Sequence, residues 1–216
     1  MTVRSFVVSP FAENTYVLSD GTEAALVDPG TMTPAERDAV EAYVEAAGLT
    51  VRHLLLTHGH VDHVFGCAHF ARLYGEAAAH GGWQLHPDDD AMLAAAPTVG
   101  AGYGVPVEPP PPAAHALAHG DVIRLGQTRL HVRHAPGHSP GSVVFHSPAD
   151  GLVIGGDVLF AGSVGRTDLP GGDAPALAAS IRRELYSLPD ATVVHPGHGP
   201  ATTVGEEKAT NPFVRG

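Results

Sequence analysis

A short loop that crowds histidine and aspartate side chains between a strand and a helix constrains this chain most. Residues 57–63 read Thr-His-Gly-His-Val-Asp-His. The run before them, residues 53–56, is largely apolar and predicts a buried strand, while residues 64–74 have the apolar spacing of a helix. Because α/β folds place their chemistry where a strand feeds a helix through a loop, the loop is the predicted site.

The loop offers donors that suit a borderline metal ion. His58 and His60 are two residues apart, so an extended backbone sends both side chains the same way. Asp62 and His63 follow the turn and can point at a neighbouring position. Imidazole and carboxylate suit zinc, iron, manganese or nickel, and the single cysteine of the chain excludes a thiolate site. This loop is therefore predicted to supply half of two adjacent metal sites.

Three further candidate ligands lie in glycine-rich turns that follow apolar strands. His138 lies in Pro-Gly-His-Ser-Pro-Gly-Ser, Asp157 in Gly-Gly-Asp-Val-Leu-Phe, and His198 in Pro-Gly-His-Gly-Pro. Glycine lets the backbone pass close to an ion and adopts φ angles that other residues avoid. The repetition of this arrangement indicates that the three turns complete the metal site.

These four ordered motifs resemble those of the metallo-β-lactamase superfamily. The resemblance covers nearly the whole chain and includes Leu-Val-Asp-Pro-Gly at residues 26–30. It implies an α/β (α+β) fold, the four-layer αβ/βα sandwich of the metallo-β-lactamase type, in a single domain over residues 1–216. Periodicity alone indicates only α/β or α+β.

The same resemblance implies a dinuclear metal site. It assigns His58, His60 and His138 to a first ion, Asp62, His63 and His198 to a second, and Asp157 to a bridge between them. The cofactors expected are two divalent metal ions, zinc first, with iron or manganese as alternatives. Zinc lowers the pKa of bound water to about 7, so a bridging hydroxide would be the nucleophile. Asp62 and this metal-bound water are the expected catalytic groups, with Asp62 orienting the hydroxide.

The branch of the superfamily is indicated by three further stretches, residues 157–173, 196–200 and 211–213. They resemble the compact, single-domain glyoxalase II-like (hydroxyacylglutathione hydrolase-like) proteins. The implied reaction is hydrolysis of an S-2-hydroxyacyl thiol to a 2-hydroxy acid and a thiol. Only 18 residues follow His198, where two-domain members carry a helical domain that binds glutathione. The thiol carrier is therefore left open, as is a lactone or other small ester as substrate.

Two alternatives of other classes remain. Gly165–Asp168 resembles a stretch of the persulfide dioxygenases, which would hold one iron with His58, His138 and Asp157. A non-catalytic metal-binding protein is the other alternative. Arg166 is expected to meet either an anionic substrate or a structural carboxylate such as Asp168.

The charge and hydropathy of the chain limit the kinds of partner that we expect it to bind. The formal net charge is −11 and the basic residues are scattered, which argues against nucleic acid as a partner. No apolar run reaches the roughly 18 residues of a membrane span, and no export signal opens the chain. A cytoplasmic protein that acts on a small thioester or ester is expected, without a membrane partner; the oligomeric state is left open.

Local patterns predict the secondary structure around these motifs. Thr33 and Pro34 predict the start of a helix that Gly48 ends. A second helix is predicted from Asp173 to Leu188. Residues 86–120 are rich in proline and glycine, which predicts a long, irregular insertion. The resemblance to the superfamily implies that this insertion borders the active site; a partly ordered surface loop is the alternative. Strands are predicted at residues 3–9, 14–19, 24–28, 122–125, 128–134, 142–147, 152–155 and 192–195, and up to residue 56.

Overall fold

The computed structural model describes residues 1–216, which divide into two compact units. The first unit comprises Met1–Leu117 and Arg124–Thr128, and the second comprises Ala118–Ile123 and Arg129–Gly216. Residues 124–128 belong to the first unit because the Asp20 carboxylate accepts hydrogen bonds from the backbone nitrogens of Gln127 at 2.7 Å and Thr128 at 2.9 Å. The predicted single domain stays a prediction.

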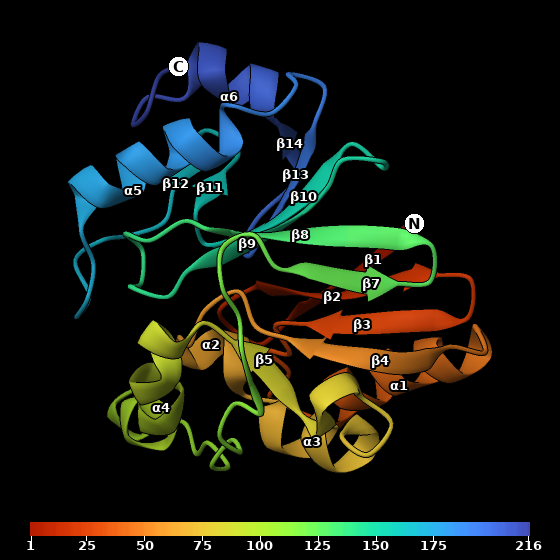
Figure 1. Ribbon diagram of the computed structural model, residues 1–216. Coiled ribbons are helices and arrows are strands. Elements are labelled where there is room, and N and C mark those ends of the chain that lie inside the picture. Colours follow the sequence, from red (N-terminus) through yellow and green to blue (C-terminus); the bar gives the residue numbers. More distant parts are fainter. The chain divides into compact units, whose positions relative to one another are not determined.

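The first unit is built on a six-stranded sheet with the order β1-β2-β3-β4-β5-β6 (Figure 1). Strands β1 to β3 form an antiparallel meander, whereas β3 to β6 run parallel. Parallel neighbours need a crossover, and their carboxyl ends meet at one edge. The loops after β3 and β4 therefore share an edge of this sheet. The strands are Thr2–Val8, Glu13–Asp20, Glu23–Val27, Thr50–Leu55, Trp83–Leu85 and His115–Ala116.

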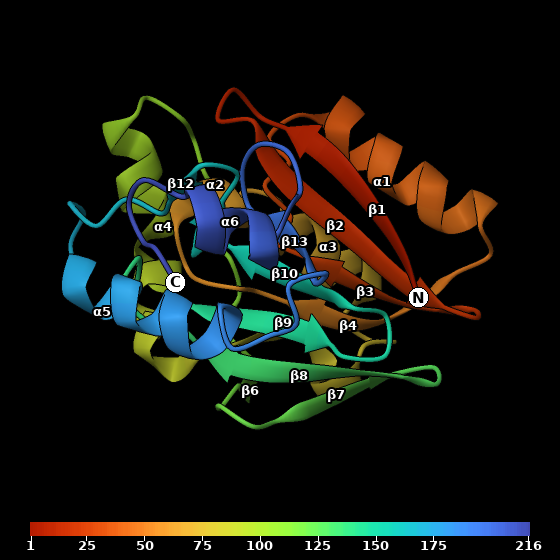
Figure 2. The same ribbon diagram turned by 90° about the horizontal axis from the view of Figure 1, so that it is seen from above.

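Helices cover one face of this sheet. Helix α1 (Pro34–Ala46) begins at the predicted cap, where Thr33 and Glu36 form a capping box. Helix α3 (Cys67–Tyr74) lies beside it on the same face (Figures 1 and 2). Val40 and Val44 of α1 and Phe70 of α3 are buried in one core with the strand residues. This face thus holds the main apolar core of the first unit.

The helix predicted at residues 64–74 is interrupted, which corrects the sequence interpretation. Helix α2 (Val61–Val64) ends before Phe65, and α3 begins only at Cys67. Between them the Gly66 nitrogen donates a hydrogen bond to the Pro29 carbonyl at 2.7 Å. A Cβ on Gly66 would lie 2.3 Å from the Thr31 hydroxyl oxygen. The break therefore lets the chain pack tightly against the loop that follows β3.

The expectation of an irregular insertion at residues 86–120 is also wrong in part. A 3-10 turn (Pro87–Asp89) leads into helix α4 (Asp90–Gly102), although Pro97 lies inside that helix. Proline removes one internal hydrogen bond of a helix and normally kinks or breaks it. Leu93, Ala96 and Gly100 are buried on one face of α4, so tertiary packing overrides the local signal. Residues 103–114 contain no helix or strand.

The second unit carries another six-stranded sheet, in the order β14-β13-β10-β9-β8-β7. Strands β8, β9 and β10 are antiparallel, and β10 runs parallel to β13. Strands β7 and β8 extend across the division between the units. The strands are β7 Val122–Leu125, β8 Thr128–His134, β9 Val143–Ser147, β10 Leu152–Gly156, β13 Val193–Pro196 and β14 Thr202–Thr203, with a small hairpin of β11 Leu159–Phe160 and β12 Ser163–Val164.

Helices α5 (Ala174–Ser180) and α6 (Val204–Thr210) cover one face of this sheet (Figure 1). The Asp173 carboxylate caps α5 as predicted, accepting from the Ala176 nitrogen at 2.9 Å. A π-helical segment continues α5 and ends at Leu185, three residues short of the predicted end. The predicted strands are all present, with ends that differ by at most one residue. No helix is both long enough and apolar enough to span a membrane.

Candidate metal centre

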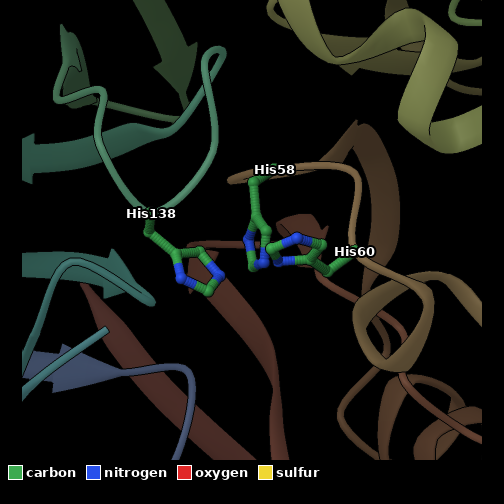
Figure 3. Close-up of side chains that lie close together, drawn as sticks. All are labelled: His58, His60 and His138. Atoms are coloured by element: carbon green, nitrogen blue, oxygen red, sulfur yellow. The ribbon is translucent and has the colours of Figure 1, made fainter. Parts of the chain in front are cut away.

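The loop after β4 carries the first two predicted ligands. His58 is buried, and His60 is the last residue before α2, with an extended backbone at φ −65° and ψ 148°. Their rings lie edge to face with centroids 4.9 Å apart (Figure 3). The two imidazoles are thus neighbours, as their spacing in the sequence predicts.

Helix α2 presents the next two predicted ligands of the first unit. His63 has no exposed surface, and its ring centroid lies 4.2 Å from that of His58. Its Nε2 atom is 3.8 Å from Oδ2 of Asp62, too far for a hydrogen bond. Two ligand atoms bound tetrahedrally at about 2.1 Å would lie about 3.4 Å apart. The observed distance is therefore close to that between two ligands of one ion.

Asp28, which directly follows β3, orients these histidines through hydrogen bonds. Its Oδ1 accepts from the Thr57 nitrogen at 2.7 Å, and its Oδ2 accepts from the Thr57 hydroxyl at 2.6 Å. His63 Nδ1 also lies 3.2 Å from Oδ2. Because the Asp28 oxygens are engaged in this way, we assign Asp28 to support of the ligands, although its oxygens lie within 4.8 Å of ligating atoms of His58 and His63.

This network fixes which nitrogen each histidine presents. The Thr57 hydroxyl donates its one hydrogen to Asp28, so it accepts from His58 Nδ1 at 3.0 Å. His63 likewise donates its Nδ1 hydrogen to Asp28. Both rings therefore leave Nε2 as the nitrogen available to a metal ion, the usual arrangement for histidine ligands. The sequence analysis did not assign Asp28 or Thr57 this role; the only signal was their position at the carboxyl ends of adjacent strands.

The second unit brings three predicted ligands together at the carboxyl ends of its strands. His138 follows β8, Asp157 follows the parallel strand β10, and His198 follows β13. Oδ2 of Asp157 lies 3.5 Å from Nε2 of His138 and 3.6 Å from Nε2 of His198. Both distances again match ligands of an ion better than hydrogen bonds. Asp157 thus stands between the two histidines.

Glycine and a backbone carbonyl set the orientation of His138, whose loop is drawn in Figure 3. Nδ1 of His138 donates to the Arg166 carbonyl at 2.8 Å, which leaves Nε2 as the nitrogen available to a metal ion. A Cβ on Gly165 would lie 1.8 Å from the Asp157 carbonyl oxygen and 3.0 Å from His138 Nδ1. Only glycine therefore fits at position 165, where the backbone passes close to Asp157 and His138.

Arg166 pairs with a structural carboxylate, Asp168, which is one of the two partners expected from the sequence. Its guanidinium forms two hydrogen bonds of 2.8 Å with the Asp168 carboxylate. This pairing lowers the pKa of Asp168 to about 2. Both side chains are exposed, so the pair is worth little as a stabilising contact. Its evident effect is to hold the Arg166 side chain against its own loop.

Cys67 is a core residue, as its small apolar neighbours predict. It is fully buried, and burial raises the pKa of its thiol well above the ordinary value, with Asp28 and Glu13 adding to the effect. Reactive cysteines have the opposite character, a lowered pKa and some exposure. A redox role for this thiol is therefore not supported.

In each unit the donor set fits a borderline divalent ion. The available atoms are imidazole nitrogen and carboxylate oxygen, which suit zinc, iron or manganese. The carboxylate oxygens stand 3.5 to 3.8 Å from the histidine Nε2 atoms. The Nδ1 atoms of three histidines are held by oxygen acceptors. The chain thus has the features of a metal-binding protein.

Comparison with known proteins agrees with this chemistry. A probable metallo-hydrolase of Bacillus subtilis is 37% identical to this chain, over 99% of this chain and 97% of the relative. The hydroxyacylglutathione hydrolase GloC of Haemophilus influenzae is 32% identical, over 99% of this chain and 98% of the relative. The Lactamase_B model, described as the metallo-beta-lactamase superfamily, matches residues 8–198.

Solved structures show the same fold. TTHA1623 in a di-iron-bound form is 40% identical with a TM-score of 0.86 over 98% of this chain and 100% of that one. The B3 metallo-beta-lactamase BLEG-1 is 34% identical with a TM-score of 0.88 over 100% of both chains. ETHE1 from Myxococcus xanthus is 28% identical with a TM-score of 0.78 over 98% and 84%. The predicted mixed α/β fold of the metallo-β-lactamase type is confirmed, and the chain belongs to the metallo-β-lactamase superfamily.

Proposed function

We propose that this chain is a hydrolase of small thioesters that holds two divalent metal ions. The first ion would be bound by His58, His60 and His138, the second by Asp62, His63 and His198, with Asp157 shared. The observation that carries this proposal is the position of the Asp157 carboxylate oxygen, 3.5 Å from His138 Nε2 and 3.6 Å from His198 Nε2. Since these histidines are assigned to different ions, a carboxylate equally near to both is what a bridging ligand requires.

Different residues of the chain would have different roles in such a reaction. When bound, the two ions would polarise the thioester carbonyl and lower the pKa of water to about 7 in the case of zinc. The Asp62 side chain is partly exposed, whereas His63 beside it is fully buried. The exposure of Asp62 supports the proposal that its carboxylate accepts a hydrogen bond from water and orients it. The network of Asp28 and Thr57 engages Nδ1 of both histidines, which leaves their Nε2 atoms to face an ion.

The thioester as substrate is supported by the full-length similarity to the hydroxyacylglutathione hydrolase of Haemophilus influenzae. The glyoxalase II-like stretches at residues 157–173 and 196–200 point the same way. Zinc is the metal that we propose, and the di-iron-bound neighbour makes iron the alternative. The thiol carrier stays open, because no residue of the chain has been assigned to it.

The first test is metal content per chain, measured on protein purified without added metal, together with hydrolysis of S-D-lactoylglutathione. We expect about two metal ions per chain, turnover that a chelator abolishes, and recovery with Zn²⁺. A panel of other thioesters, lactones and a chromogenic β-lactam would define the substrate class, since one structural neighbour is a B3 metallo-beta-lactamase. Full metal loading without turnover on the whole panel would contradict the proposal and favour a non-catalytic metal-binding protein.

The second candidate function is an iron-dependent persulfide dioxygenase. The Gly-Arg-Thr-Asp stretch at residues 165–168 favours it, and this reading needs only His58, His138 and Asp157 as ligands. Oxygen uptake with glutathione persulfide separates the two functions. One iron per chain, oxygen uptake and no thioester hydrolysis would replace the first proposal by the second.

A further inference from the structure

A fully buried carboxylate outside the proposed ligand set lies beside His63. Glu13 is the first residue of β2, and none of its surface is exposed. Its Oε1 atom lies 3.7 Å from Nδ1 of His63 and has no hydrogen-bond partner. An ionised carboxylate is costly to bury unless neighbouring groups or ions offset its charge. The position of Glu13 next to a histidine of the metal centre therefore needs a physical reason.

The surrounding residues hold Glu13 in this position. Thr15 places its hydroxyl 2.8 Å from Oε2 of Glu13 and accepts from the Gly30 nitrogen at 3.0 Å. A Cβ on Gly30 would lie 2.3 Å from Oε2 of Glu13 and 2.3 Å from the Asp62 carbonyl oxygen. The space for this carboxylate thus exists only because residue 30 is glycine. The same contacts tie Glu13 to the loops that carry Asp28 and Asp62.

Three carboxylates surround one imidazole at this point. Asp28 Oδ2 is 3.2 Å and Glu13 Oε1 is 3.7 Å from Nδ1 of His63, while Asp62 Oδ2 is 3.8 Å from its Nε2. His63 offers only one hydrogen at Nδ1, so it cannot by itself offset this concentration of negative charge. A cation at Nε2 would offset it.

We propose that Glu13 is a positioning residue for the second metal ion, acting through His63. With Asp28 it holds the Nδ1 edge of the ring, so that Nε2 faces the ion and donates more strongly. Glu13 does not contact the ion itself. This inference rests on the proposed two-metal function. Loss of such an outer partner of a metal ligand typically weakens metal binding 10- to 100-fold.

The test is a Zn²⁺ titration of metal-free protein, comparing the wild type with Glu13→Gln. Glutamine keeps the shape of the side chain but removes the charge. We expect the second equivalent of Zn²⁺ to bind about 10- to 100-fold more weakly and the first to bind unchanged. The matched control is Glu184→Gln, because Glu184 is also buried but pairs with Arg133 and Arg183 in the second unit. This control should bind both equivalents as the wild type does.

A second measurement needs no metal ion. The ¹⁵N shifts of the His63 ring in the metal-free wild type should report hydrogen on Nδ1, and Glu13→Gln should raise the population of the Nε2-protonated form. A purely structural role for Glu13 would change thermal stability without changing this tautomer ratio. Equal affinities for both equivalents in the wild type and in Glu13→Gln would overturn this inference alone. A wild type that binds only one equivalent would overturn the two-metal proposal and this inference with it.

Discussion

Replacing Thr57 by valine tests the hydrogen-bond network that orients the ligands. Valine has nearly the same shape as threonine but lacks the hydroxyl. That hydroxyl lies 2.6 Å from Asp28 Oδ2 and 3.0 Å from His58 Nδ1, and Thr57 is buried. Thr57→Val therefore removes one hydrogen bond to a charged group and leaves the Nδ1 hydrogen of His58 without its acceptor. The backbone hydrogen bond from residue 57 to Asp28 stays.

The expected loss can be estimated from these contacts. A hydrogen bond to a charged group contributes about 1.5–3 kcal/mol, and an ordinary one contributes about 1 kcal/mol. The free energy of unfolding of the metal-free protein should therefore fall by about 2–4 kcal/mol. For a chain of this length that corresponds to a fall in Tm of about 5–15 °C. Calorimetric melting of the metal-free protein is the assay, and Thr57→Ser, which keeps the hydroxyl, is the control.

Metal binding provides a second measure of the same change. Once His58 can rotate or place its hydrogen on Nε2, Zn²⁺ affinity should fall about 10- to 100-fold in Thr57→Val. Thr57→Ser should bind almost as tightly as the wild type. If the valine and serine variants have the same Tm and the same Zn²⁺ affinity, the Thr57 hydroxyl does not orient His58, and the reasoning is refuted.

Three further predictions concern the bridge, the ions and pH. Asp157→Ala should stay folded by circular dichroism but lose most of its turnover and at least one metal ion; full activity would refute the bridging role. Chelation of two ions present at about 100 times their Kd removes about 2.7 kcal/mol each, so Tm should fall by about 10–20 °C; an unchanged Tm would contradict metal binding. Burial, with Arg133 and His131, lowers the pKa of His146 from 6.5 to about 4. His146 is thus neutral in the folded protein between pH 4 and 6.5, whereas it takes up a proton in the unfolded chain. The free energy of unfolding should therefore be highest above pH 6.5 and decline toward pH 4, by at most about 3 kcal/mol. Urea unfolding measures this pH dependence, and His146→Asn should reduce it.

The turns that carry the candidate ligands were predictable because they follow local rules. The predicted ligand turns come after strands, such as residues 128–134, where apolar and polar residues alternate, and residues 152–156, which are apolar throughout. The start of α1 was equally clear, since Thr33 and Pro34 are local signals of a helix start. Patterns of this kind depend on neighbours in the sequence and can be read without the structure.

The supporting network was not predictable in the same way. Glu13 and Asp28 meet His63 only because β2, β3 and β4 lie side by side, and a sequence pattern carries no such contact. Helix α4 was missed for a related reason. Pro97 argues locally against a helix, while the burial of Leu93 and Ala96 that favours the helix is visible only after folding. Long-range packing thus decided both this network and helix α4.

The histidine ligands are oriented from the Nδ1 side, by Asp28, Thr57 and the Arg166 carbonyl. None of these hydrogen bonds uses a residue on the Nε2 side, where the proposed ions and substrate would bind. Substitutions on that side can therefore change which substrate is accepted while the ligands keep their geometry. Such a separation allows one scaffold to diverge in activity, and full-length neighbours of this chain are named both as a hydroxyacylglutathione hydrolase and as a B3 metallo-beta-lactamase.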